Sequence, residues 1–249
     1  MKVLKALSKP VVKEEKPVAS PEAMEQMIVD LVDDQLSKRN TPYFKQMGYF
    51  RPSQTNQCAR FWHYMFEGIE MQNSFSAQTY RIFDNGHAVH DRLYGYFREC
   101  GILVAEEIPV QCDDPPIQGT ADGIIDIHGH KLIELKSISM EGFAYRDLNK
   151  KPTDDHYRQA QIYMHCLDLD SGFVIYENKN NQRILPIYIE RDQVFIDKLF
   201  KKYRKIHEDF QKGLKPDRPY KRTSKHCASC DLVNQCWSDS EGVKAEDPF

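Results

Sequence analysis

The segment of residues 119–137, GTADGIIDIHGHKLIELKS, restricts the fold of this chain most, because it sets charged residues inside a strand–turn–strand pattern. Asp122 lies in a mostly alternating strand, Gly129 marks a hairpin turn, and the partner strand follows. Glu134 and Lys136 are two residues apart in that second strand, so their side chains point to the same face. The hairpin therefore predicts two carboxylates and an ammonium at one point of a sheet.

The charges of this hairpin occupy an otherwise apolar run, Leu132 to Ile138, where an unpaired charge is costly. Two interpretations fit the pattern. One is an ordinary hairpin with a surface Glu–Lys pair. The other is a site in which carboxylate oxygens bind Mg²⁺ or Mn²⁺, the ions that hard oxygen ligands favour. Such an ion lowers the pKa of a bound water and offsets charge on a phosphoryl group, and Lys136 would then orient the water or stabilise the transition state.

Three further polar residues lie on helices that flank the hairpin in the sequence. His90 belongs to a helix expected over Ser76 to Cys100, on a face where a lone histidine is more often a core residue. Gln159 and Tyr163 are four residues apart on a helix expected over Asp155 to Leu167, so they share one side of it. Each signal is weak by itself. Together with the hairpin, these residues follow one another along the chain in the order His, Asp, Glu-x-Lys, Gln-x3-Tyr.

This ordered set resembles the RecB-type branch of the PD-(D/E)xK nuclease superfamily over roughly residues 51–237. The resemblance implies an α/β fold with a restriction-endonuclease-like core, in which helices flank a central mixed β-sheet. It also implies that His90, Asp122 and Glu134, with the carbonyl of Leu135, bind the metal. Asp122, Glu134 and Lys136 would be catalytic, and Gln159 and Tyr163 would position the lysine and the DNA. The segments that carry the resemblance are GHAVH ending at His90, GTADGIID with Asp122, ELK with Glu134 and Lys136, and QAQIY with Gln159 and Tyr163.

Four of the seven cysteines form a second pattern. Cys227, Cys230 and Cys236 give C-x2-C-x5-C, and Cys58 stands 169 residues before the first of them. Three clustered thiolates need a fourth ligand to close a tetrahedral or cubane site. The spacing leaves zinc and a [4Fe–4S] cluster both open, and His226 offers a further ligand for zinc.

The segment CARFWHY resembles the C-P-R-x-x-W/Y segment of iron–sulfur members of the same branch, except that Ala59 replaces the proline. Those members include CRISPR-associated RecB-like exonucleases, AddB-type nucleases and many phage exonucleases. The resemblance implies a structural [4Fe–4S] subdomain that joins the N- and C-terminal segments. Its ligands would be Cys58, Cys227, Cys230 and Cys236. For Cys100, Cys112 and Cys166 we expect separate packing without disulfides, because cytoplasmic thiols stay reduced.

The formal net charge of −3 excludes a uniformly basic nucleic-acid binder but not a local basic surface. Residues 198–225 carry eleven Lys and Arg against three acids, whereas residues 84–126 carry nine acids and two Arg. This contrast fits an acidic metal centre beside a phosphate-binding rim. The candidate DNA contacts are Arg60 in the aromatic segment, Lys201 and Lys205 in the basic stretch, and Tyr145 and Arg146 in a loop expected over residues 141–153.

We expect a single nuclease domain over residues 21–237, preceded by a flexible arm (1–20) and followed by an acidic tail (238–249). No apolar run approaches ~20 residues, and the N-terminus lacks the apolar core of a signal peptide, so no membrane contact and a cytoplasmic location are expected. The nucleotide-binding pattern GxxxxGK[ST] is absent, so a helicase would be a separate chain, as would a recombinase or a CRISPR integrase.

The sequence therefore predicts a Mg²⁺- or Mn²⁺-dependent exonuclease acting on DNA ends or single strands. Its setting would be replication, recombination, repair or CRISPR adaptation, in phage or prokaryotes. Two alternatives stay open. One is a catalytically silent DNA-binding scaffold of the same fold, which would be free to lose His90, Asp122, Glu134 and Lys136. The other is a zinc-containing hydrolase with an unrelated core, in which Zn²⁺ replaces the cluster.

Overall fold

The computed structural model describes residues 20–72 and 75–238 of the chain. The expected N-terminal arm up to residue 19 and the acidic tail from residue 239 lie outside the described residues. Within the described ranges, no helix is long and apolar enough to cross a membrane.

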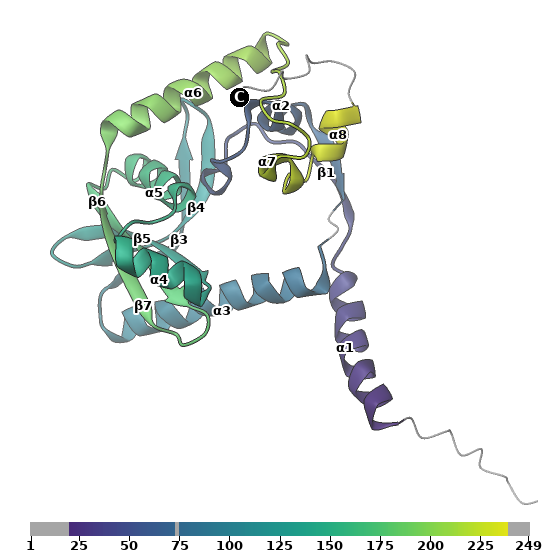
Figure 1. Cartoon of the computed structure of the whole chain (residues 1–249). Coiled ribbons are helices and arrows are strands. Elements are labelled where there is room, and N and C mark those ends of the chain that lie inside the picture. Colours follow the sequence, from purple (N-terminus) through teal and green to yellow (C-terminus); the bar gives the residue numbers. More distant parts are fainter. Residues whose placement is uncertain (1–19, 73–74, 239–249) are drawn as a thin grey trace, which may run out of the picture.

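A five-stranded mixed sheet forms the centre of the fold (Figure 1). Its order is β3-β4-β5-β6-β7, and β5 and β6 are parallel while the other neighbours are antiparallel. The predicted central mixed sheet is therefore confirmed. The strands are β3 (Leu103–Cys112), β4 (Ile117–Asp126), β5 (His130–Ile138), β6 (Ser171–Asn178) and β7 (Ile184–Glu190).

The β4–β5 hairpin forms as the sequence predicts. The chain reverses over residues 127–129, where His128 and Gly129 both have positive φ, at 53° and 99°. Glycine adopts positive φ without steric cost, which is why it is favoured here. The turn aligns Gly123 with Ile133, so Asp122 arrives beside the Glu134–Leu135 peptide.

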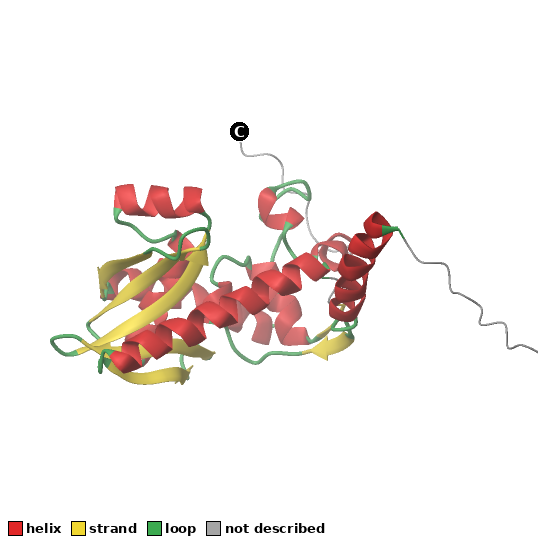
Figure 2. Ribbon diagram, turned by 90° about the horizontal axis from the view of Figure 1, so that it is seen from below, coloured by secondary structure: helices red, strands yellow, loops and turns green. Residues whose placement is uncertain are grey.

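Helices cover both faces of the sheet (Figure 2). On one face, α3 (Ala77–Glu99) packs its apolar side against β5 and β6, and on the other face α5 (Asp154–Cys166) does the same. Ser76 and Thr153 cap these two helices with their side chains, which satisfies a free N–H group at each start. Buried contacts on the α3 face involve Val89, Leu93, Ile133, Leu135 and Ile175; those on the α5 face involve Leu132, Ala160, Tyr163, Val174 and Tyr176.

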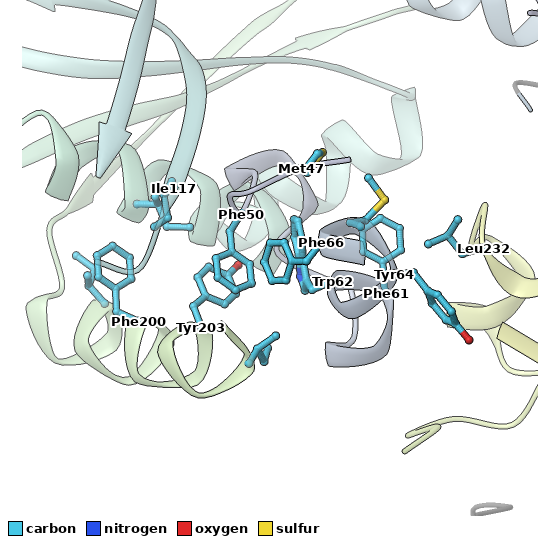
Figure 3. Close-up of a cluster of buried hydrophobic side chains, with 14 residues drawn as sticks. Met47, Phe50, Phe61, Trp62, Tyr64, Phe66, Ile117, Phe200, Tyr203 and Leu232 are labelled. Carbon is cyan, nitrogen blue, oxygen red and sulfur yellow. The ribbon is translucent and has the colours of Figure 1, made fainter. Parts of the chain in front are cut away.

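A second group of elements packs at one end of the sheet. It comprises η1 (Pro52–Gln54), α2 (Ala59–Glu67), α7 (Lys225–Ala228), α8 (Val233–Ser238) and a small antiparallel sheet of β1 (Pro42–Lys45) and β2 (Ile69–Gln72). An aromatic core joins this group to α6 (Gln193–Gln211), as Figure 3 shows. In that core the ring of Phe50 stacks on Tyr203 with centroids 4.3 Å apart, and its edge meets Trp62. The sequence patterns described above did not predict the small sheet.

Helix α1 (Pro21–Ser37) begins at a proline, as expected, and projects away from the sheet in Figure 1. Its contacts with the rest of the chain run to α3. Arg81 of α3 pairs with Asp33, and Arg39, which follows α1, pairs with Asp84 at 3.0 Å.

Two expectations are wrong. Residues 141–153 were expected to form a loop, but α4 (Met140–Asn149) occupies most of them, capped by the side chain of Ser139. Cys112 and Cys166 were expected to pack separately, but they form a disulfide that ties the end of β3 to the end of α5. They are 54 residues apart, so no local pattern in the sequence could pair them.

Candidate active site

Asp122 is fixed at the centre of the site by two hydrogen bonds. Its Oδ2 accepts the backbone N–H of Leu135 at 2.6 Å, which ties β4 to β5 next to the paired residues Gly123 and Ile133. Its backbone carbonyl accepts the hydroxyl of Tyr94 at 2.7 Å, and the same hydroxyl lies 3.1 Å from Glu107 Oε1. The side chain of Asp122 is therefore held by its own neighbours, with Oδ1 left for another partner.

Fully buried Glu134 and half-buried Lys136 form an ion pair on one face of β5, as their two-residue spacing predicts. Lys136 Nζ donates to Glu134 Oε1 and lies 3.8 Å from Asp122 Oδ2. Glu134 is fully buried, and its Oε2 has no hydrogen-bond partner in the described structure. Burial and the nearby Asp122 charge raise the pKa of Glu134, while the attraction of Glu134 and Asp122 raises the pKa of Lys136 despite its burial.

His90 reaches the same point from α3. Its Nε2 lies 3.1 Å from the carbonyl oxygen of Leu135, and its Nδ1 lies 3.9 Å from Asp122 Oδ1. Tyr94 stands one helical turn later and anchors the Asp122 backbone, so one face of α3 supplies both residues. The four predicted metal ligands, His90, Asp122, Glu134 and the Leu135 carbonyl, thus converge from three elements.

This donor set fits a divalent cation. Two carboxylates and a carbonyl are the hard ligands that Mg²⁺ and Mn²⁺ favour, and Glu134 Oε2 is a buried acceptor that lacks a donor. Over the described residues, no three His, Cys, Asp or Glu side chains are close enough together to hold an ion as they stand. In this arrangement the ammonium of Lys136 lies beside both carboxylates: it donates to Glu134 and is 3.8 Å from Asp122 Oδ2.

Gln159 and Tyr163 lie on the α5 face that covers the site, and both are buried. Their side chains hydrogen-bond to each other, and the Tyr163 hydroxyl also bonds to the backbone of Thr120 on β4. Burial, followed by the charge of Glu134, raises the pKa of Tyr163, so this hydroxyl stays protonated. A Cβ at Gly119 would stand 2.9 Å from the Tyr163 hydroxyl oxygen, so only glycine allows this approach.

Two open grooves flank η1 near these residues. The larger has a volume of about 760 Å³ and is lined mostly by polar and charged side chains of α4, α5 and α6. The smaller, of about 440 Å³, includes Gln159 and Tyr163 in its lining. The larger groove is lined by Thr55, Asn56, Tyr145, Arg146, Thr153, Asp154, Asp155, Arg158, Leu199, Lys202, Tyr220 and His226.

The predicted DNA contacts separate into three cases. Tyr145 and Arg146 line the larger groove, although they lie on a helix and not on the expected loop. Lys201 and Lys205 are exposed on α6 but do not line it, and Lys205 pairs with Asp209. The prediction for Arg60 is wrong: it is 1% exposed and donates to the carbonyl of Pro216 at 2.6 Å, so it packs within the fold.

The four predicted cluster cysteines line one cavity. Cys58 directly precedes α2, Cys227 lies in α7, Cys236 lies in α8, and Cys230 stands between those two helices. All four are free thiols, whereas Cys100, the other free thiol of the described chain, is exposed elsewhere. Apolar and aromatic side chains, among them Phe61, Leu232, Val233 and Trp237, complete the lining.

The four cysteine thiols are partly shielded from solvent by neighbouring side chains. Burial raises the pKa of Cys58, and burial raises the pKa of Cys230 to about 11. Arg218 is buried beside them, donates twice to the carbonyl of Cys236 at 3.0 and 2.7 Å, and lies over the Trp237 ring. Four thiols around one cavity fit a soft metal or an iron–sulfur cluster by the chemistry of the donors.

Sequence analysis missed Tyr94, His156, Tyr176 and Lys202 as neighbours of the site or its groove. Tyr176 is fully buried on β6 and hydrogen-bonds to His156 of α5, next to the strand that carries Lys136. The spacing from His90 to Tyr94, four residues on one helix, is the single local signal that could have found one of them.

No protein-family model matches this chain, and no curated protein matches it by sequence. Among solved structures, the alkaline exonuclease LHK-Exo from Laribacter hongkongensis is similar with a TM-score of 0.49 and 16% identity, over 73% of this chain and 94% of that one. The same enzyme in complex with dAMP gives 0.47 and 16%, over 68% and 90%. The structure of SSO0001 gives 0.48 and 16%, over 86% and 98%. Similarity at this level assigns no activity to the chain.

Proposed function

We propose that this protein is a divalent-metal-dependent deoxyribonuclease that hydrolyses phosphodiester bonds, acting as an exonuclease on DNA ends or single strands. One observation carries the proposal. Asp122, Glu134 and Lys136 meet at a buried point on β4 and β5, and His90 reaches the Leu135 carbonyl beside them. Carboxylates, a carbonyl and an imidazole around a half-buried lysine are a donor set that suits a hydrolytic metal centre.

His90, Asp122, Glu134 and the carbonyl of Leu135 would hold Mg²⁺ or Mn²⁺. When bound, the ion supplies an activated water and neutralises charge on the phosphate that is attacked. Lys136 then contributes as a fixed ammonium: its raised pKa keeps it charged, so it stabilises developing negative charge and orients the water. Gln159 and Tyr163 hold the site from the α5 side.

The larger groove is the proposed path of the DNA. Arg146, Arg158 and Lys202 provide positive charge along it, although Arg158 is paired with Asp154 and Asp155 of the same lining. Tyr145 and the stacked pair of Tyr220 and His226, with ring centroids 4.4 Å apart, offer flat surfaces for bases. Positive side chains together with aromatic rings are the usual combination for binding single-stranded nucleic acid. Lys201 and Lys205, exposed on α6, stay proposed contacts for DNA outside the groove.

A [4Fe–4S] cluster on Cys58, Cys227, Cys230 and Cys236 is proposed as a structural staple. It would join α2 to the C-terminal helices and so fix one wall of the DNA groove, because Tyr220 and His226 line both the groove and the cysteine cavity. Zinc on the same thiols is the alternative, and metal analysis distinguishes the two.

The test is degradation of 5′- and 3′-labelled single- and double-stranded DNA with Mg²⁺ or Mn²⁺. We expect activity that EDTA abolishes and that Lys136→Ala and Glu134→Gln both lose. The matched control is Lys131→Ala, which removes a lysine from the same strand at the hairpin end. Wild-type rates in both site variants would overturn the proposal. A folded wild-type protein that binds the DNA but cleaves none of it would favour the silent scaffold instead.

A further inference from the structure

Lys136 stands beside a hydrogen-bonded pair that the sequence patterns do not single out. Strands β5 and β6 are parallel, and their register sets Lys136 against Tyr176 and Glu134 against Val174. Residues two apart on a strand share a face, so Tyr176 and Lys136 are neighbours on the face that α5 covers. Tyr176 is fully buried there, in the same core as Ala160 and Tyr163 of α5.

The hydroxyl of Tyr176 joins β6 to the start of α5. It accepts the backbone N–H of Thr153 at 3.1 Å, and it lies 2.8 Å from Nδ1 of His156. Thr153 donates to this oxygen, and the hydroxyl proton goes to Nδ1 of His156 in the tautomer that leaves this nitrogen unprotonated. Burial, with the charges of Lys136 and Arg146, lowers the pKa of His156 to about 3, so its ring is neutral and can accept.

Three side chains of α5 face the site from one stripe of the helix. His156, Gln159 and Tyr163 follow the spacing of three and four residues that places side chains on one side. Gln159 and Tyr163 contact the β4 end of the site, and His156 contacts β6 beside Lys136. The hydrogen bond between His156 and Tyr176 therefore fixes how α5 is rotated over Lys136. It does so near the start of the helix, whereas Tyr163 lies near its end.

We propose that Tyr176 and His156 are a positioning pair for Lys136. Their hydrogen bond locks α5 onto β6, which keeps the Tyr176 ring beside the lysine and limits the positions that its ammonium can take. Neither residue touches the reacting phosphate. This inference rests on the proposed nuclease function for its kinetic part, while the hydrogen bond itself can be tested without it.

The first measurement is independent of activity. In ¹⁵N-labelled protein, the Nδ1 resonance of His156 should have the shift of an unprotonated, hydrogen-bonded nitrogen and should not titrate between pH 5 and pH 8. Tyr176→Phe removes the hydroxyl alone and should move that resonance. A His156 ring that is protonated on Nδ1, or a resonance that Tyr176→Phe leaves in place, would overturn the proposal even if the protein cleaves DNA.

The second measurement is kinetic and uses a double-mutant cycle. Tyr176→Phe and His156→Leu should each lower kcat by about tenfold to a hundredfold with little change in KM, and the double variant should be no worse than either single one. His156→Asn should restore kcat, because its Oδ1 accepts where Nδ1 did. The control is Tyr203→Phe, which deletes a buried hydroxyl in the other core and should leave kcat unchanged.

Each kinetic outcome decides between positioning and stability. The positioning role would be overturned if the losses in kcat add in the double variant. It would also be overturned if kcat follows thermal stability across all variants and His156→Asn does not restore it. If the wild type cleaves no DNA while the His156 resonance behaves as expected, the nuclease proposal fails and the hydrogen-bonded pair stands.

Discussion

The backbone N–H of Leu135 donates to Asp122 Oδ2 at 2.6 Å, so one oxygen of this carboxylate supports the hairpin while the other faces His90. The two oxygens of one side chain therefore have different functions. Different substitutions at Asp122 should therefore separate metal binding from the buried hydrogen bond to the Leu135 N–H.

Asp122→Asn and Asp122→Ala should both abolish cleavage but differ in stability. Asparagine can still accept the Leu135 N–H and removes a charge that disfavours ionised Glu134, so its unfolding free energy should stay near wild type. Alanine leaves that N–H buried without a partner, which costs about 1–3 kcal/mol. Urea denaturation of the three proteins measures the difference. Equal stability of the two variants would show that the hydrogen bond contributes little.

Glu134→Gln should remove the stabilisation that a divalent ion gives. An ion that binds only the folded state stabilises it by about 2.7 kcal/mol at one hundred times its Kd, so the Tm of the wild type should rise with Mn²⁺. The variant keeps the shape of this fully buried side chain but lacks the charge. The control is Glu141→Gln, an exposed acid in the first turn of α4. A Tm rise in Glu134→Gln equal to that of the wild type would place the ion elsewhere.

The sequence patterns predicted correctly those parts of the site that depend on residues close together in the chain. Asp122, Glu134 and Lys136 were found because a two-residue strand period and a glycine turn place them together, and both strands of that hairpin form as expected. The order of the motifs added His90 and the Leu135 carbonyl through a family resemblance and not through spacing. Nothing local could add Tyr176, because its place beside Lys136 depends on the parallel pairing of β5 with β6.

The failures have the same physical origin. Arg60 looks exposed in an amphipathic helix, but its guanidinium meets the carbonyl of Pro216, which lies 156 residues later. The Cys112–Cys166 disulfide also joins residues from distant elements. Residues 141–153 lack an apolar stripe, yet α4 forms because Ser139 caps it and Phe143 is buried against the sheet core. In each case a tertiary contact outweighs the local signal.

Cys58→Ala should release the proposed cluster, whereas Cys100→Ala should not. The first residue lines the cysteine cavity, and the second is an exposed free thiol outside it. Wild-type protein purified without oxygen should contain about four iron and four sulfide per chain with visible absorption, and Cys58→Ala should lose both. One zinc per chain and no iron in the wild type would replace the cluster with the zinc alternative.

The Cys112–Cys166 disulfide should be visible as missing thiols. After metal removal and denaturation without reductant, the protein should titrate five free thiols, and seven after reduction. Closing a loop with a sequence separation of 54 stabilises the fold by about 4 kcal/mol in the chain-entropy model, so Cys112→Ser should unfold at lower urea. Cys100→Ser serves as the control. Seven thiols without reductant would show that both sulfurs are reduced in solution.

His156 should make the fold less stable as the pH falls below 6.5. Burial, then the charges of Lys136 and Arg146, lowers its pKa from 6.5 to about 3 in the folded chain. Between those values the unfolded state binds the extra proton, so the unfolding free energy decreases with falling pH and is unaffected above 6.5. One proton contributes at most about 1.4 kcal/mol per pH unit.

Urea denaturation at pH 5, 6, 7 and 8 measures this slope. His156→Asn should flatten it between pH 5 and 6 relative to the wild type and leave the slope from pH 7 to 8 unchanged. The matched control is His128→Asn in the exposed β4–β5 turn, where asparagine tolerates the positive φ. If His156→Asn follows the wild-type slope throughout, His156 takes up its proton as readily in the fold as in the unfolded chain. The neutral acceptor that Tyr176 requires would then be absent below pH 6.5.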